Sequence, residues 1–69
     1  MKQFEDQDEA IEAVMEKLEE LPDEKLAFFF MNLFGAEGLL EMARDFIEAR
    51  EYDFETEKDV DRFIAQMLS

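Results

Sequence analysis

The chain has 69 residues, with 20 Asp or Glu against 7 Lys or Arg, and therefore a formal net charge of −13 at pH 7. It contains no Cys and no His, which excludes disulfides, thiolate metal sites and most side-chain chemistry that operates near neutral pH. A surface this negative attracts basic partners and repels nucleic acid and anionic membranes.

Length and apolar content predict a single acidic helical domain over residues 1–69, with residues 1–6 frayed. Hydrophobic residues make up 48% of the chain, including eight Phe and five Met, which is too apolar for a disordered protein. A chain of this length buries only about 60% of the surface exposed by its unfolded form. Its stability must therefore come from dense apolar packing or from oligomerisation.

The first predicted helix covers residues 8–20, and Asp6 or Asp8 is expected to cap its start. One side of this helix is apolar, because Ile11, Val14, Met15, Leu18 and Leu21 recur at helical spacing. The opposite side is acidic and carries Glu5, Glu9, Glu12, Glu16, Glu19 and Glu20.

The second predicted helix covers residues 23–34, with Asp23 as its cap and Gly35 as its C-terminal stop. Pro22 separates it from the first helix, because proline is not tolerated in a helix interior. Consecutive helical residues are about 100° apart, so Phe28 and Met31 point away from the main apolar side. We expect neighbouring helices to bury this helix all round. The alternative is that Phe28 and Met31 are exposed and contact a second copy or another protein.

Residues 37–50 and 57–68 are predicted to form the third and fourth helices. Tyr52 and Phe54 anchor the loop between them, and Thr56 is expected to cap the fourth helix. Short connections favour antiparallel neighbours, so the fold class is all-α, a compact bundle of four short helices. The predicted core consists of Ile11, Val14, Leu18, Leu26, Phe29, Phe30, Leu33, Leu39, Ala43, Phe46, Ile47, Val60, Phe63, Ile64 and Met67.

The acidic side of the first predicted helix is the main candidate for a functional surface. Residues three or four apart place a carboxylate about every 5–6 Å along the helix axis. One strand of nucleic acid carries a phosphate about every 3.4 Å of axis. Two interpretations stay open: a solvated outer face, or a decoy that holds a partner's Lys and Arg where phosphates would lie. The acidic excess continues through the third predicted helix and residues 51–61, which favours the decoy.

The residues give little support for calcium binding, DNA binding or catalysis. An EF-hand needs Gly at its sixth position and Glu at its twelfth, but counting from Asp53 these positions hold Lys58 and Ile64. The second and third predicted helices have the outline of a helix-turn-helix, yet the would-be recognition helix exposes acids that repel phosphates. No nucleophile–base set or phosphate loop is present. We therefore expect no enzyme, no metal, no cofactor and no direct nucleic-acid binding.

These observations predict a small acidic protein-binding inhibitor or regulator that presents its glutamates to a basic surface of a nucleic-acid-binding protein, as a nucleic-acid mimic. The alternative is a self-associating structural or assembly protein, with Phe28 and Met31 at the dimer interface and acidity that serves solubility. In general profile the chain resembles phage-encoded nucleic-acid mimics, bacterial immunity proteins and acidic antitoxins, a compositional similarity that transfers no individual residue. The start of the chain lacks a signal-peptide pattern and the longest apolar stretch is too short to span a bilayer, so we expect no membrane partner and a cytoplasmic location.

Overall fold

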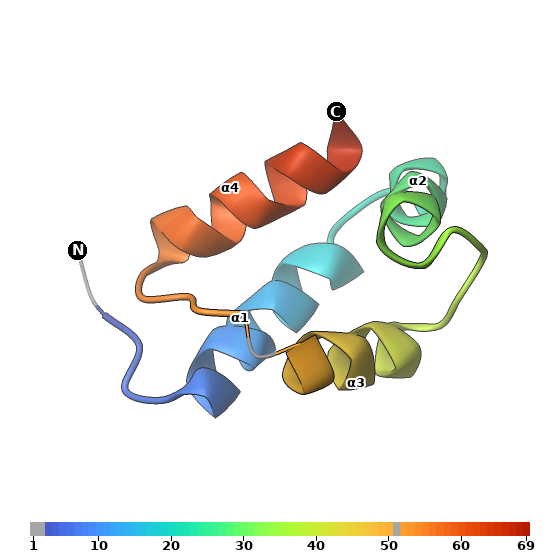
Figure 1. Cartoon of the computed structure of the whole chain (residues 1–69). Coiled ribbons are helices and arrows are strands. Elements are labelled where there is room, and N and C mark those ends of the chain that lie inside the picture. Colours follow the sequence, from blue (N-terminus) through green and yellow to red (C-terminus); the bar gives the residue numbers. More distant parts are fainter. Residues whose placement is uncertain (1–2, 51) are drawn as a thin grey trace.

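A computed structural model describes residues 3–50 and 52–69, and over these ranges the chain forms four helices joined by short loops (Figure 1). The helices are α1 (Gln7–Glu19), α2 (Asp23–Phe34), α3 (Leu40–Arg50) and α4 (Glu57–Leu68). Helix α1 packs against both α3 and α4, and α2 packs mainly against α4. The predicted all-α bundle of four short helices is confirmed.

Asp6, one of the two residues predicted to cap α1, takes the cap position. Asp6 has extended backbone geometry, and the backbone N–H of Glu9 donates to its carboxylate at 2.9 Å. The predicted cap of α2 is wrong, because Asp23 is already the first helical residue and Pro22 holds the cap position. Proline's fixed φ suits that position, and Asp23 keeps a favourable place in the first turn, where negative charge is stabilised.

Helix α2 ends at Gly35, as predicted, in the left-handed conformation with a φ of 77°. The Gly35 N–H donates to the Met31 carbonyl at 2.8 Å and closes the last turn. A Cβ added at Gly35 would have no heavy atom within 4 Å. Any cost of a side chain at this position is therefore conformational rather than steric.

We expect Gly35→Ala to lower the free energy of unfolding by about 1 kcal/mol, because L-residues with a Cβ disfavour left-handed backbone. Urea denaturation followed by circular dichroism measures the change. Gly35→Asn is the control and should lose less, since Asn adopts this conformation more readily. Equal losses in the two variants would show that the backbone conformation is not the cause.

Helix α3 begins at Leu40 rather than at the predicted residue 37. The preceding segment passes against the end of α2, where a Cβ on Gly38 would lie 2.8 Å from Cε2 of Phe34. Leu39 precedes the first helical residue, and its carbonyl accepts the Ala43 N–H at 3.1 Å. Its side chain is 68% exposed, so the prediction of Leu39 as a core residue is wrong. The half-buried Leu40 packs against the core from the first turn of α3.

The entry to α4 is held by local hydrogen bonds around Thr56, which takes the predicted cap position. The backbone N–H groups of Glu55 and Thr56 donate to the Asp59 carboxylate at 2.9 and 3.2 Å. Gln3 forms an isolated antiparallel bridge with Thr56, and the N–H of Phe4 donates to the Glu55 carbonyl at 2.8 Å. Of the segment predicted to fray, residues 1 and 2 lie outside the described ranges.

The Asp59 contribution to stability is expected to depend on pH. The N–H groups of Glu55 and Thr56, and then the nearby Arg62, hold the pKa of Asp59 below its usual value. A lowered folded-state pKa gives stabilisation that is complete above the unfolded-state pKa and is lost as the pH falls through the folded value. Wild type should therefore exceed Asp59→Asn in unfolding free energy at neutral pH, and the difference should shrink as the pH falls below about 4.

Urea denaturation at a series of pH values measures this difference. Asp45→Asn, which removes one carboxylate from an exposed position on α3, controls for the change in net charge. A wild-type advantage over Asp59→Asn that stays constant with pH would contradict the assigned role of the ionised carboxylate.

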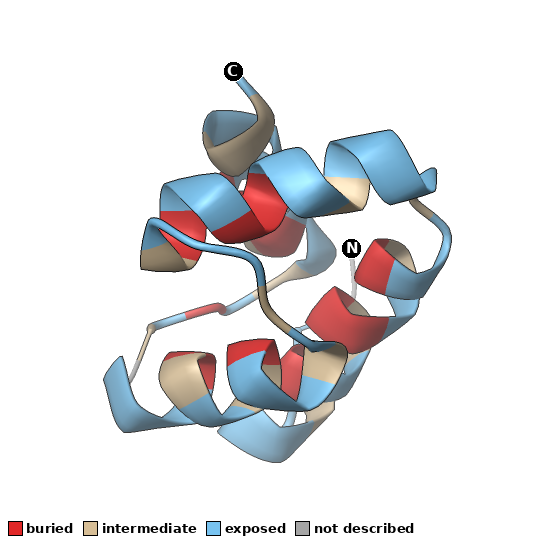
Figure 2. Cartoon of the chain, turned by 90° about the vertical axis from the view of Figure 1, so that its right-hand side faces the viewer, coloured by how far each residue is buried: buried red, intermediate tan, exposed pale blue. Residues whose placement is uncertain are grey.

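The core lies where the inner sides of all four helices meet the loop before α4 (Figure 2). Most of the predicted core is confirmed, whereas Leu26, Phe46 and Met67 are partly buried and pack at its margin. Phe63 stands at the centre of an aromatic cluster, with ring centroids of Tyr52, Phe54 and Phe29 at 4.9, 5.4 and 5.9 Å. The buried apolar residues are Ala10, Ile11, Val14, Met15, Leu18, Phe29, Phe30, Leu33, Ala43, Ile47, Phe54, Val60, Phe63 and Ile64.

Candidate functional site

The acidic side of α1 forms one wall of a groove of about 360 Å³ that we call the α1–α3 groove. Its floor is apolar, with Met15 buried and Leu40 half-buried. Glu41 adds a carboxylate from the α3 side. The groove is lined by Glu12, Met15, Glu16, Glu19, Leu40, Glu41 and Arg44. Three of the six glutamates predicted to form the acidic face are therefore brought together with a fourth from α3.

Arg44 is the cation that lines this groove. Its Nη2 lies 2.7 Å from Oε1 of Glu12, and its Nε lies 3.6 Å from Oε1 of Glu48. The hydrogen bond from Arg44 to Glu12 is the main reason why the pKa of Arg44 lies above its ordinary value. Four carboxylates and one guanidinium leave three net negative charges around the groove. Within the described residues, the other three glutamates of the groove form no ion pair.

The remaining predicted glutamates lie away from the α1–α3 groove. Glu5 precedes α1, and its backbone N–H donates to the carboxylate of Glu9 at 3.1 Å. Glu9 is half-buried and belongs to the N-terminal turn of α1. Glu20 stands at the C-cap of the same helix. The predicted acidic row is thus divided between the two ends of α1 and the wall of one groove.

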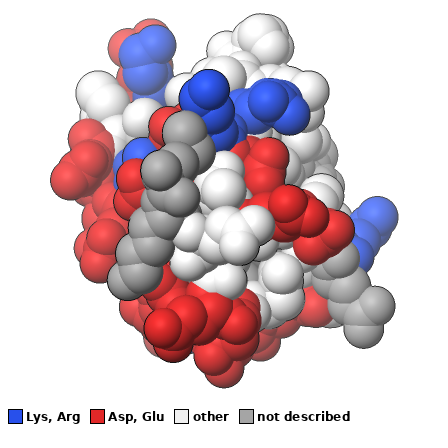
Figure 3. Space-filling view, turned by 90° about the vertical axis from the view of Figure 1, so that its left-hand side faces the viewer, with Lys and Arg blue, Asp and Glu red and all other residues white. Residues whose placement is uncertain are grey.

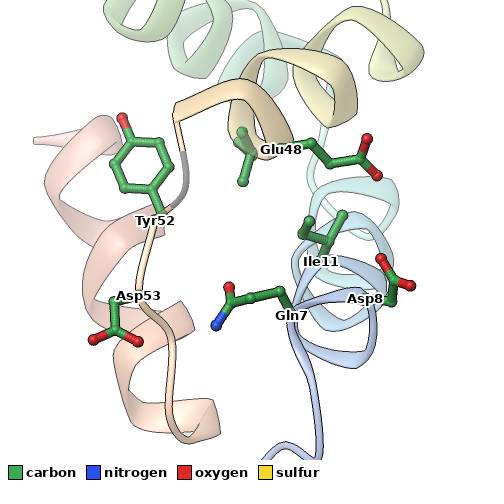
Figure 4. A pocket seen from close by; sticks show the side chains of 7 residues that line it. Gln7, Asp8, Ile11, Glu48, Tyr52 and Asp53 are labelled. Atoms are coloured by element: carbon green, nitrogen blue, oxygen red, sulfur yellow. The ribbon is translucent and has the colours of Figure 1, made fainter.

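A second groove, which we call the Tyr52 groove, has a volume of about 550 Å³ and lies between α1, α3 and the loop before α4 (Figure 4). Its apolar floor is made by the buried Ile11 and Ile47. In Figure 4, the segment that carries Tyr52 and Asp53 lies on the opposite side of the hollow from Gln7. The groove is lined by Gln7, Asp8, Ile11, Ile47, Glu48, Tyr52 and Asp53.

Three carboxylates of the Tyr52 groove, those of Asp8, Glu48 and Asp53, come from separate elements of the fold. This groove was not predicted from the sequence, because no local spacing connects residues so far apart in the chain. On the face shown in Figure 3, Asp and Glu gather at the bottom and on both sides of an uncharged central area, and several Lys and Arg lie toward the top. The negative charge is therefore unevenly distributed over this face.

The outer face of α2 differs in character from these acidic grooves. Phe28 and Met31 are 50% and 51% exposed, so the expectation that α2 is buried all round is wrong. The reason is that α2 packs mainly against α4, which covers one side and leaves the opposite side open. A hollow of about 290 Å³, lined by Glu24, Lys25, Phe28 and Leu68, lies beside this face.

Among the described residues, no group of three or more Asp or Glu side chains is arranged to hold a metal ion. None of the helices described combines the length and apolar character needed to cross a membrane. Comparisons of the chain with protein-family models, curated proteins and solved structures give no match. Its surface chemistry is therefore the basis for assigning a function.

Proposed function

We propose that this protein is an inhibitor or regulator that binds a basic surface of another protein through the α1–α3 groove. The observation that carries the proposal is the concentration of four carboxylates around an apolar floor, with one cation among them. Partners are expected in the cytoplasm, among proteins whose basic surface otherwise binds nucleic acid.

The spacing of the α1 carboxylates supports a nucleic-acid mimic. Glu12, Glu16 and Glu19 follow at intervals of four and three residues, or about 6 and 4.5 Å along the helix axis. Phosphates on one nucleic-acid strand repeat about every 3.4 Å of axis, so the two arrays present negative charge at a comparable linear density. Glu41 extends the array to a second helix.

The floor of the groove supports recognition of Lys and Arg in particular. These side chains carry a charge on an aliphatic stem, and the stem packs on apolar surface while the head remains polar. Met15 and Leu40 offer such a surface beside the groove's carboxylates. An Arg head pairs with a carboxylate through two parallel N–H donors. The Tyr52 groove has the same combination of apolar floor and acidic rim, and extends the surface available to a basic partner.

A competition experiment tests the proposal. Immobilised protein is expected to retain basic nucleic-acid-binding proteins at low salt and to release them at high salt, because salt screens exposed charges. Each retained protein is then titrated, while bound to labelled nucleic acid, with the free acidic protein. Displacement of the nucleic acid supports a mimic. Retention of no basic protein at low salt, or simultaneous binding of both ligands, would contradict it.

A further inference from the structure

Arg44 contacts one carboxylate of each acidic groove. Its Nη2 lies 2.7 Å from Oε1 of Glu12, which lines the α1–α3 groove. Its Nε lies 3.6 Å from Oε1 of Glu48, which lines the Tyr52 groove. Glu48 follows Arg44 by four residues on α3, and residues at this spacing are neighbours on one helix face. The same guanidinium therefore has one partner on α1 and another on its own helix.

The contact between Arg44 and Glu12 opposes the binding of an external cation in the α1–α3 groove. It occupies one of the four carboxylates that line the groove, and the guanidinium reduces the net negative charge there from four to three. A cation that enters the groove is repelled by Arg44 and meets a Glu12 carboxylate that is already paired. Arg44 thus competes with a basic partner for this groove.

The ion pair between Arg44 and Glu12 can open at small cost. The two side chains are 40% and 58% exposed, and exposed ion pairs contribute little to stability. Helices α1 and α3 pack against each other and share the apolar core, in which Ala43 of α3 is fully buried. Their packing therefore does not depend on the ion pair. An Arg44 side chain that leaves Glu12 keeps a carboxylate within reach, because Glu48 is already near its Nε.

We infer that Arg44 is an internal competitor that controls access to the α1–α3 groove. In the free protein Arg44 pairs with Glu12, and when a basic partner binds, its guanidinium turns to Glu48 and leaves Glu12 to the partner. A lone cation gains little from this exchange, because one ion pair replaces another. A partner with several Lys or Arg side chains also meets the other three glutamates of the groove, so Arg44 favours multivalent basic surfaces over single cations. This inference rests on the proposed function, because it describes the regulation of the same groove.

Calorimetric titration with a hexa-arginine peptide at low salt tests the competition. We expect Arg44→Gln to bind the peptide about two- to fivefold more tightly than wild type, which is the range of one exposed ion pair. Lys58→Gln is the matched control, because it also removes one positive charge, from an exposed position on α4, and it should change binding less. Weaker binding by Arg44→Gln, or equal tightening in the two variants, overturns the inference.

The role of Glu48 is tested by Glu48→Gln, made both in wild type and in Arg44→Gln. In wild type this substitution removes the carboxylate that receives the displaced guanidinium, so the peptide should bind about twofold or more weakly. In the Arg44→Gln background no guanidinium needs a new partner, and Glu48→Gln should have a smaller effect. Equal fold-changes in the two backgrounds would show that Glu48 acts independently of Arg44, which overturns the exchange of partners.

The same titrations separate this inference from the proposed function. If neither wild type nor Arg44→Gln binds hexa-arginine, the α1–α3 groove does not recognise basic side chains, and the proposed function fails together with the inference. If both bind with equal strength, the groove recognises arginine without competition from Arg44, and only the inference fails. Circular dichroism checks the fold of each variant. Loss of the fold in Arg44→Gln would make Arg44 a support between α1 and α3 and would also overturn the inference.

Discussion

Phe29→Ala is expected to remove most or all of the stability of the domain. Phe29 is fully buried, and its ring meets those of Phe30 and Phe63 edge-on, with centroids 6.1 and 5.9 Å away. Truncating a buried Phe costs about 3–5 kcal/mol. A domain of this size has a total stability of about 3–10 kcal/mol. Thermal and urea unfolding followed by circular dichroism should show a large fall in the midpoint or no cooperative transition.

Phe28→Ala is the matched control, because it makes the same change at the preceding residue. Phe28 is 50% exposed, so its loss should cost less than about 1 kcal/mol in dilute protein. Comparable losses of stability in the two variants would contradict the assignment of the inner and outer sides of α2.

We expect the triple replacement of Glu16, Glu19 and Glu41 by Gln to weaken the binding of a basic partner about tenfold. The reason is that each exposed ion pair contributes about 0.2–1 kcal/mol to binding. These glutamates are chosen because all three line the α1–α3 groove, whereas the carboxylate of Glu12 is already paired with Arg44. Stability should stay equal or rise, since self-repulsion falls. Binding is measured by calorimetry over a range of salt concentrations, and the salt dependence should decrease in the variant.

The control for this variant replaces Glu37, Glu55 and Glu57 by Gln. All three are exposed, and their substitution changes the net charge by the same amount outside the α1–α3 groove. Nearly unchanged binding in this control would assign recognition to the groove. Equal weakening in both triple variants would contradict a defined face and assign the attraction to the charge of the whole surface.

Local features of the fold were predictable from the residues themselves. Helical periodicity identified the buried sides of α1 and α4, because residues three and four apart share a face whatever surrounds the helix. Gly35 and Thr56 marked helix ends for reasons confined to their own backbone and neighbours. The start of α3 was predicted three residues too early, and the segment before it passes close to Phe34, an approach that no local sequence pattern indicates.

By itself, the sequence determined the helical class, the position of each residue around its own helix and the acidic character of one side of α1. Only the tertiary structure decided which helix or loop packs against each side of a given helix. It placed Glu41 and Arg44 opposite the α1 glutamates, brought Asp8, Glu48 and Asp53 to one groove, and left Phe28 and Met31 exposed because α4 covers one side of α2. The physical reason is that helical period is a property of local backbone geometry, whereas exposure depends on packing between segments that are distant in the chain.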